Sequence, residues 1–174
     1  MRYRNDGLKR NAYPDLSHIF FARLMDSPDN SSSVLVRILL VEDFEPFRMK
    51  VRSLIKERAE FMVLGEVSDG SAAVQKADEL RPDLILMDIG LPSINGIEAA
   101  RQILRSNPQS RILFLTQESS SDVVSEAFDL GARGYIVKMD ARQDMLLGID
   151  AVMRGEKFVS ASLKRLGFSR FTDA

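Results

Sequence analysis

The sequence contains no cysteine and only one histidine among its 174 residues. The lack of cysteine excludes disulfides, thiolate metal sites and cysteine nucleophiles, and His18 has no metal-ligating neighbours, so we assign it no role. No uninterrupted apolar stretch approaches the roughly 20 residues that a membrane-spanning helix needs. Arg23 interrupts the apolar run at residues 19–22 too early for a secretory signal. These absences predict a soluble cytoplasmic protein without redox chemistry and without a membrane partner.

Neither sign of charge is in excess, because 24 Lys and Arg residues face 25 Asp and Glu residues, for a net charge of -1. The chain therefore has no overall attraction to nucleic acid or to anionic membranes. No glycine-rich phosphate loop follows any apolar run, which argues against nucleotide binding. A length of 174 residues suits one domain with a proper core rather than two large ones.

Short apolar runs alternate with stretches of helical period from residue 34 onward. This alternation is typical of repeated βα units around a buried parallel sheet. The last helical stretch ends near Gly155, a residue type that commonly follows a helix. We predict an α/β fold with five helices and five strands, the strands at residues 36–41, 61–67, 84–87, 112–115 and 135–137.

The two ends of the chain do not join this pattern. Residues 1–33 begin basic and finish in a Ser-rich linker, so we expect a flexible N-terminal extension. A short amphipathic helix over residues 16–25 is the alternative for this extension. We expect the domain to cover residues 34–156, followed by a C-terminal tail or truncated linker at residues 157–174, in which residues 158–168 add at most one helical turn.

Polar residues stand where the predicted strands end. The carboxyl ends of parallel strands lie at one edge of a sheet, where ligands and chemistry collect in open α/β folds. Four separate segments therefore point polar groups toward one crevice. These groups are Glu42 and Asp43, Asp88, Thr116 and Lys138.

In this arrangement the chain resembles the receiver domain of bacterial two-component response regulators, closest to those that precede a C-terminal helix-turn-helix output domain. The family places an acidic pair, an aspartate, a Ser/Thr and a lysine after its first, third, fourth and fifth strands. Residues 91–96 are similar to its loop after the aspartate, and residues 131–135 to the approach to its fifth strand. The resemblance implies a doubly wound (βα)5 fold with a five-stranded parallel sheet in the flavodoxin-like order 2-1-3-4-5.

The resemblance also implies a phosphorylation switch rather than an enzyme. Asp88 would accept a phosphoryl group from a sensor histidine kinase or phosphotransfer protein, and Lys138 and Thr116 would bind its oxygens. Thr116 and Tyr135 would act as the switch, with Tyr135 turning inward. Catalysis would be limited to slow Mg²⁺-dependent self-phosphorylation and autodephosphorylation.

A divalent cation resolves the repulsion among the acidic residues. Two carboxylates about 4 Å apart repel by about 4 kcal/mol at an effective dielectric constant near 20, so one would protonate without a counter-charge. An all-oxygen site with room for waters and phosphate oxygens suits Mg²⁺. We expect Glu42, Asp43 and Asp88 to bind Mg²⁺, with the backbone carbonyl of Gly90 added by the resemblance.

Each of these residues also has an ordinary explanation when taken alone. Asp88 fits a turn former, and Glu42 with Asp43 fits a cap of the first helix. Thr116 fits strand propensity, and Lys138 fits a solvated loop. Their joint placement at strand ends favours the phosphorylation site.

Two alternative functions depend on residues that lie close to the polar groups at the strand ends. A Mg²⁺-dependent phosphatase of the haloacid-dehalogenase type needs a second aspartate two positions after the first, where this chain has Gly90. A receiver-like module that never takes phosphate is the other alternative, and two departures from the family pattern motivate it. Gln117 replaces the family's usual small residue after the Ser/Thr, and Met139 replaces the proline that often follows the lysine.

The C-terminal residues argue against direct contact with DNA. Residues 155–168 resemble the linker before a helix-turn-helix, but Lys164, Arg165 and Arg170 are too few, and the tail is too short, to read a DNA groove. Either an effector domain is missing or the chain acts through another protein, and the sequence leaves both open. The family also leads us to expect a homodimer formed through the last helices.

Overall fold

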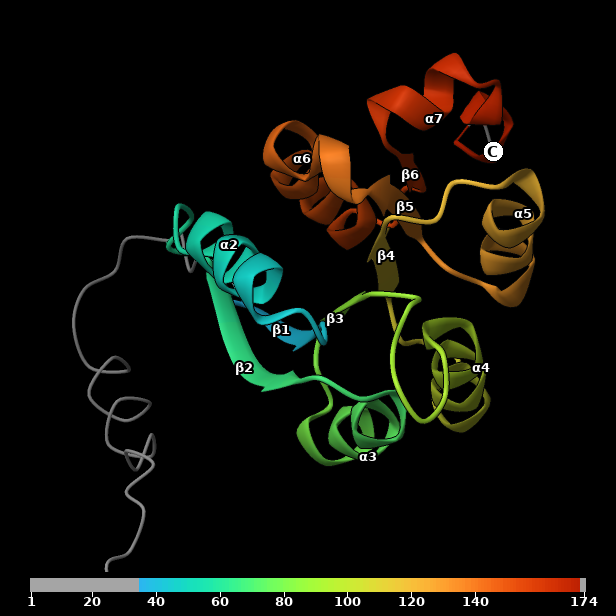
Figure 1. Cartoon of the computed structure of the whole chain (residues 1–174). Helices are drawn as coiled ribbons and strands as arrows, with labels where there is room; N and C mark the ends of the chain where they lie inside the picture. Colours follow the sequence, from blue (N-terminus) through green and yellow to red (C-terminus); the bar gives the residue numbers. More distant parts are fainter. Residues whose placement is uncertain (1–34, 173–174) are drawn as a thin grey trace, which may run out of the picture. The chain divides into compact units, whose positions relative to one another are not determined.

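Six parallel strands form one sheet in the computed structural model, which describes residues 35–172 (Figure 1). Their order is β2-β1-β3-β4-β5-β6, which confirms the predicted order 2-1-3-4-5 and adds one strand. The N-terminal extension lies outside the described residues. The strands are β1 (Val36–Val41), β2 (Phe61–Val67), β3 (Leu84–Met87), β4 (Ile112–Thr116), β5 (Gly134–Val137) and β6 (Phe158–Val159).

The helices cover both faces of the sheet, as a doubly wound fold requires (Figure 1). Helices α2 and α6 pack with one set of strand side chains, and α3, α4 and α5 pack with the alternate set. None of the helices within residues 35–172 is long and apolar enough to cross a membrane. The helices are α2 (Glu45–Ile55), α3 (Gly70–Leu80), α4 (Gly96–Ser106), α5 (Ser121–Leu130), α6 (Ala141–Met153), α7 (Ala161–Arg165) and the 3₁₀ turns η1 (Lys138–Asp140) and η2 (Phe168–Phe171).

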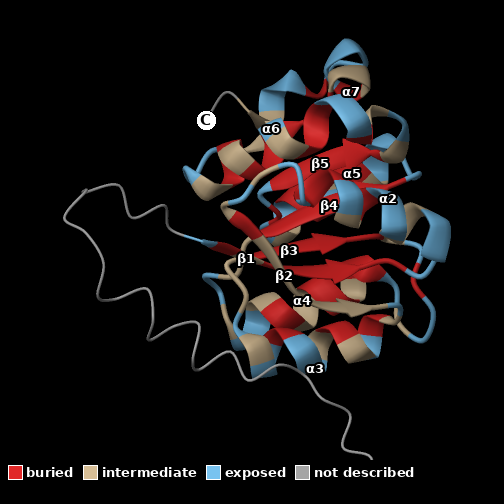
Figure 2. Cartoon of the chain, turned by 90° about the vertical axis from the view of Figure 1, so that its left-hand side faces the viewer, coloured by how far each residue is buried: buried red, intermediate tan, exposed pale blue. Residues whose placement is uncertain are grey.

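The central strands are buried on both faces, which explains their continuous apolar runs (Figure 2). All four residues of β3 and all four of β5 are buried. Alternate residues of a strand point to opposite faces, so Leu84 and Leu86 join the core under α2 and α6, whereas Ile85 and Met87 join the other.

The loop between β3 and α4 folds back closely on the end of β3. The Asn95 side chain caps α4 by accepting a hydrogen bond from the Glu98 N–H at 2.9 Å. A Cβ atom on Gly96 would lie 2.0 Å from the carbonyl oxygen of Asp88. Only glycine permits this approach, so Gly96 fixes the path of the chain around Asp88.

The C-terminal segment, residues 158–172, is more ordered than the sequence predicted. Strand β6 pairs with β5, and Leu163 of α7 is fully buried. The Phe171 ring stacks on Phe128 of α5 at a centroid distance of 4.6 Å. The prediction that this stretch adds at most one helical turn is therefore wrong, because it extends the sheet and buries apolar side chains.

Candidate functional site

The acidic residues meet because β1 and β3 are neighbours in the sheet. Val41 pairs with Met87, so the residues that follow, Glu42 and Asp88, leave the sheet side by side. Carboxylate oxygens of Glu42, Asp43 and Asp88 lie within 4.8 Å of one another. Glu42 is 2% exposed and Asp88 6%, whereas Asp43 is exposed. The predicted acidic cluster thus forms at the edge expected from the sequence.

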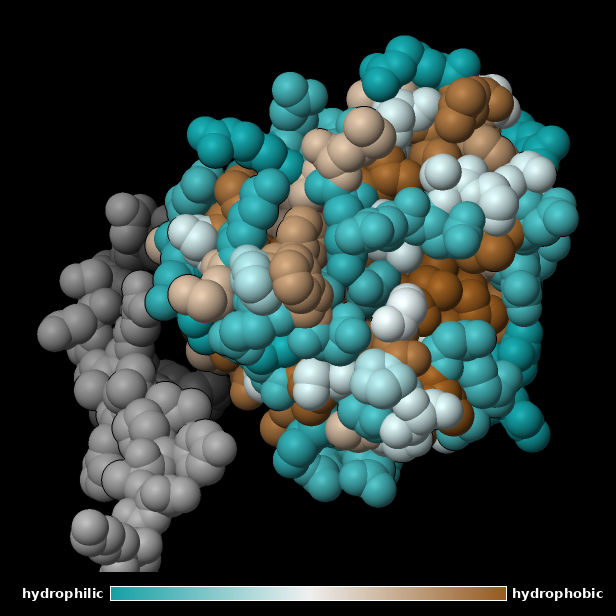
Figure 3. Space-filling model, viewed as in Figure 1, coloured by the Kyte–Doolittle hydropathy of each residue, from teal (hydrophilic) through white to brown (hydrophobic). Residues whose placement is uncertain are grey.

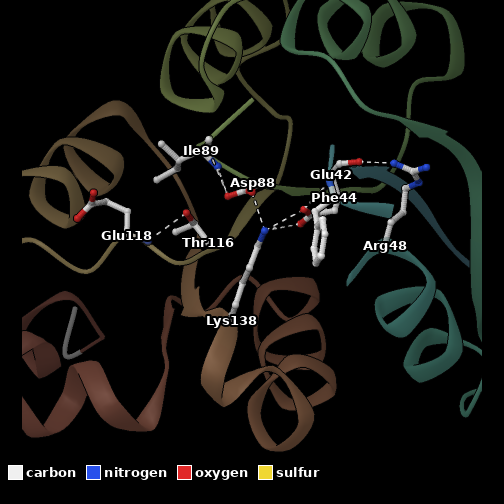
Figure 4. A network of polar contacts seen from close by, with 9 residues as sticks. Glu42, Phe44, Arg48, Asp88, Ile89, Thr116, Glu118 and Lys138 are labelled. Atoms are coloured by element: carbon white, nitrogen blue, oxygen red, sulfur yellow. Dashed lines mark hydrogen bonds and ion pairs between the residues drawn. The ribbon is translucent and has the colours of Figure 1, made fainter. Parts of the chain in front are cut away.

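Lys138 lies between two of these carboxylates (Figure 4). It directly follows β5, and its Nζ lies 2.6 Å from Asp88 Oδ2 and 2.8 Å from Glu42 Oε2. Burial lowers the pKa of Lys138, but the hydrogen bonds to Asp88 and Glu42 outweigh burial, so this pKa lies above its ordinary value. Lys138 therefore supplies a positive counter-charge to the site.

Glu42 is buried and is held by hydrogen bonds through both its side chain and its backbone. Burial raises the pKa of Glu42 above its usual range; hydrogen bonding to Lys138 opposes this rise and the charge of Asp88 adds to it. The Phe44 N–H donates to Glu42 Oε1 at 3.1 Å, and the Arg48 guanidinium donates to the Glu42 carbonyl at 2.6 Å. Backbone and side chain of Glu42 are both held by the start of α2.

The two carboxylate oxygens of Asp88 have different partners. Oδ1 accepts hydrogen bonds from the backbone N–H of Ile89 at 2.6 Å and of Gly90 at 3.3 Å. Oδ2 accepts from Lys138. These hydrogen bonds hold both carboxylate oxygens and so fix the orientation of the Asp88 side chain at the end of β3.

Thr116 and Tyr135 reach the same edge of the sheet, but their hydrogen bonds go to Glu118. The Thr116 Oγ accepts from the Glu118 N–H at 3.3 Å, and the Tyr135 hydroxyl donates to the Glu118 carbonyl at 3.0 Å. Tyr135 is fully buried; burial, followed by the charges of Glu118 and Asp88, raises its pKa. Tyr135 is thus already buried in this structure, and its inward turn on phosphorylation stays a prediction.

The two departures from the family pattern lie at the rim of the site. Gln117 is exposed and Met139 is 84% exposed. Together with Lys138, Ser162 and Leu166, among others, they line a cavity of about 210 Å³. On the face shown in Figure 3, hydrophobic patches are separated by hydrophilic side chains.

One contact in the site was not anticipated from the sequence. The Lys138 ammonium lies over the ring of Phe47, 4.7 Å from its centroid. Phe47 belongs to the first turn of α2, where its apolar character predicts only packing against the core. The sequence contains no signal that joins a phenylalanine at position 47 to a lysine at position 138.

The acidic cluster fits a hard divalent cation. Its donors are all carboxylate oxygens, and exposed Asp43 leaves one side open to water and phosphate oxygens. This donor set suits Mg²⁺, which binds few carboxylates and keeps several waters. Lys138 already bonds to Glu42 and Asp88, so a metal ion would share these two carboxylates with the ammonium.

A flavodoxin-like sheet with a carboxylate–lysine centre at the ends of its strands defines a receiver-type signalling domain. The chain belongs to the response regulator receiver domain family, because the sequence model of that family matches residues 38–150. This is a family of two-component signalling domains, which act in phosphorylation-dependent signalling and are not classical enzymes.

Relatives of known sequence and structure agree with this membership. Protein CcdB of Bacillus subtilis is 37% identical over 119 residues, which cover 68% of this chain and 98% of CcdB. The response regulator protein VraR of Staphylococcus aureus is 36% identical over 121 residues, 70% of this chain but only 58% of VraR. A LuxR-family two-component response regulator from Aurantimonas sp. SI85-9A1 superimposes with a TM-score of 0.73 at 33% identity, covering 75% of this chain and 94% of that structure.

Proposed function

We propose that the chain is a phosphorylation switch of a two-component phosphorelay, and that Asp88 accepts the phosphoryl group. The donor would be a sensor histidine kinase or a phosphotransfer protein. The observation that carries this proposal is the placement of Lys138, which contacts Asp88 at 2.6 Å beside the cluster of Glu42, Asp43 and Asp88. An oriented nucleophile, a positive charge and an oxygen-rich cation site are what phosphoryl transfer requires.

The chemical step is a displacement at phosphorus. A carboxylate oxygen of Asp88 forms a new bond to phosphorus, and the bond from phosphorus to the donor breaks. The electron pair of that bond leaves with the histidine nitrogen of the kinase, or with the acetate oxygen when acetyl phosphate is the donor. The product is an acyl phosphate on Asp88, and Lys138 passes from the carboxylate to a phosphoryl oxygen.

Mg²⁺ would neutralise the charge on the phosphoryl oxygens during this step. Glu42, Asp43 and Asp88 would hold the ion, together with the backbone carbonyl of Gly90. Glu42 has a longer side chain than aspartate and already bonds to Lys138 through both oxygens, at 2.9 and 2.8 Å. We therefore assign Glu42 a water-mediated role, while Asp43 and Asp88 bind the ion directly.

The conformational response would pass through Thr116. Its hydroxyl would give up the hydrogen bond from the Glu118 N–H and donate to a phosphoryl oxygen instead. This change would release the backbone of Glu118, whose carbonyl now accepts a hydrogen bond from Tyr135. Reversing a 1:99 population takes about 5.5 kcal/mol. Hydrogen bonds to charged groups contribute about 1.5–3 kcal/mol each, so several new bonds to the phosphoryl group are needed rather than one.

The output would act through other proteins. The match with VraR covers only 58% of that response regulator, so the outputs of such longer relatives do not transfer to this chain. We propose a protein partner or a second copy of the chain as the receiver of the signal, and no direct contact with DNA.

Phosphorylation with acetyl phosphate tests this function. Wild-type protein and Asp88→Asn are incubated with the donor, with and without Mg²⁺, and intact masses are recorded. Asp129→Asn is the matched control, because Asp129 is exposed on α5. We expect one phosphoryl group per chain in the wild type and the control, only with Mg²⁺, and none in Asp88→Asn. Labelling retained in Asp88→Asn would refute the assignment, and an unlabelled wild type would favour an interaction module that never takes phosphate.

A further inference from the structure

We propose that Phe47 is a positioning residue for Lys138, and that its ring aims the ammonium at the reacting phosphoryl group. This inference rests on the proposed phosphorylation of Asp88. The Lys138 Nζ lies over the Phe47 ring, 4.7 Å from the centroid. A cation within about 6 Å of an aromatic centroid is attracted by the negative face of the ring.

Lys138 needs such support, because lysine is a point charge on a flexible four-carbon stem. The next residue, Met139, is 84% exposed and gives the stem no such support. Both carboxylates that now hold Lys138 are also needed for the reaction. Asp88 must attack phosphorus, and Glu42 belongs to the cation site. When they take up these roles, the bonds that hold Lys138 at rest weaken.

The Phe47 ring is the contact of Lys138 that does not change during the reaction. It carries no charge, binds no metal and takes no part in bond making. It therefore attracts the ammonium equally before and after a cation and a phosphoryl group enter the site. Its contribution is largest where water is excluded, and the Lys138 side chain is only 11% exposed.

The ring itself is held in place by the fold. Phe47 packs against the core that α2 and α6 share, and the Phe47 N–H donates to the Phe44 carbonyl at 3.0 Å in the first turn of α2. The preceding residue, Pro46, fixes the backbone at the start of this helix. The Lys50 ammonium also contacts the ring, 5.8 Å from the centroid. A ring anchored in the core in this way can act as a fixed support.

Replacing Phe47 by leucine removes the aromatic face but retains an apolar side chain. Phe158→Leu is the matched control, because Phe158 is partly buried in the same core and carries Lys164 over its ring at 5.2 Å. Phe158 lies in β6 and pairs with Gly134, at the opposite end of β5 from Lys138. The two substitutions therefore impose similar packing losses, but only one of them touches Lys138.

The phosphorylation rate is measured against acetyl phosphate concentration at saturating Mg²⁺, together with the thermal unfolding midpoint. We expect Phe47→Leu to lower the maximal rate about tenfold, because without the ring the ammonium points at the phosphoryl group in a smaller fraction of the molecules. The donor concentration at half-maximal rate should stay unchanged. Phe47→Tyr should restore the rate, and Phe158→Leu should stay within about twofold of wild type while lowering the midpoint as much as Phe47→Leu does.

A second readout does not depend on phosphorylation. The chain contains no tryptophan, so Phe47→Trp introduces a single indole at this position. We expect Lys138→Met in that background to change the indole emission, whereas Lys56→Met, an exposed change at the end of α2, should not. Unchanged emission after loss of Lys138 would overturn the contact.

The outcomes separate the two proposals. An unlabelled wild type contradicts the phosphorylation of Asp88 itself. A labelled wild type with equal maximal rates for Phe47→Leu and Phe158→Leu contradicts only the role of Phe47, as does a failure of Phe47→Tyr to restore the rate.

Discussion

On one side of Asp88, Lys138 bonds to the Asp88 carboxylate and to Glu42 at distances between 2.6 and 2.9 Å. On the other side, Thr116 and Tyr135 bond to Glu118, at 3.3 and 3.0 Å. We call the first group the lysine side and the second the hydroxyl side. The side proposed to neutralise the charge of a phosphoryl group is thus already bonded to Asp88, whereas the side proposed to respond to phosphorylation bonds to Glu118 instead.

The difference follows from the cost of burying charge. Glu42 and Asp88 are buried carboxylates, and a buried charge must be paired or neutralised. Folding therefore brings Lys138 to them. The hydroxyls of Thr116 and Tyr135 are neutral and need only one polar partner each, which Glu118 provides. Neutral groups can exchange that partner for a phosphoryl oxygen without leaving a bare charge behind.

The two sides also differ in what covers them. The C-terminal segment lies behind the hydroxyl side, where the Ser160 N–H donates to the Tyr135 carbonyl at 3.0 Å and the Val137 N–H donates to Ser160 Oγ at 3.3 Å. The lysine side is itself nearly buried but is flanked by two exposed side chains, Phe44 at 59% and Met139 at 84%. We expect a partner to approach Asp88 past these two exposed side chains.

Loss of Lys138 should have the largest effect after loss of Asp88 itself. Lys138→Met leaves the phosphoryl oxygens without their positioned ammonium, and removal of one preorganised electrostatic group costs about a hundredfold in rate. The rate of labelling by acetyl phosphate at saturating Mg²⁺ measures this, with Lys56→Met as the control. If Lys138→Met were labelled as fast as Lys56→Met, the lysine side would have no part in the transfer.

Thr116→Val should have a smaller effect on transfer and a larger one on the response. The hydroxyl supplies one hydrogen bond to a charged group, so we expect labelling to slow about tenfold. In Thr116→Val the NMR resonances of the Tyr135 ring should no longer shift on phosphorylation of Asp88. Thr116→Ser, which keeps the hydroxyl, should retain the shift. An undiminished shift in Thr116→Val would mean that the response reaches Tyr135 by another route.

Leu163→Ala should loosen the C-terminal segment without changing the lysine side. Removing a buried leucine side chain costs about 2–5 kcal/mol in a rigid core, but a terminal segment can open locally, which limits the loss to its own docking free energy. Hydrogen exchange at Ser160 and Ala161 should quicken while the labelling rate of Asp88 stays constant. Leu166→Ala, at a residue that is 66% exposed, is the control. Slower labelling in Leu163→Ala would show that the segment supports both sides.

The smallest effect concerns pH and Asp140, which accepts a hydrogen bond from the Ser162 N–H at 2.9 Å. Burial raises the pKa of Asp140, but hydrogen bonds from Ser162 outweigh burial and hold it below its ordinary value of 3.8. Because the pKa of Asp140 is lower in the folded than in the unfolded protein, the stabilisation by its ionised carboxylate is fully present above pH 3.8. This stabilisation is lost as the pH falls through the lower pKa of the folded protein. We expect faster exchange at Ser162 in that acid range, and a smaller pH dependence in Asp140→Asn. An equal dependence in both proteins would show that another group anchors α7.

Much of the fold could be predicted because its signals are local. The apolar runs at residues 36–41, 61–67 and 84–87 coincide with β1, β2 and β3. The acidic cluster followed from them, since parallel strands end at one edge. Strand β6 escaped prediction because it has two residues, Phe158–Val159, and forms through pairing with β5 rather than through a pattern of its own.

The unpredicted parts of the site depend on contacts between distant segments. The bonds from Lys138 to Glu42, and its approach to Phe47, join β5 to the start of α2 across about 90 positions of sequence. The burial of Tyr135 has the same origin, because β6 and the C-terminal segment cover a strand that would otherwise form the edge of the sheet. Residue types at strand ends predicted that Lys138 pairs with Asp88, but not that it also bonds to Glu42 and contacts Phe47.

Reduction of the phosphorylated protein with borohydride tests the role of Asp88 most directly, because this reagent converts an aspartyl phosphate to homoserine. Wild-type protein is treated with acetyl phosphate and Mg²⁺, reduced, digested and sequenced by mass spectrometry. We predict homoserine at position 88, only when both donor and Mg²⁺ were present. Homoserine at another aspartate, or at none while the protein carries a phosphoryl group, would contradict Asp88 as the phosphoacceptor.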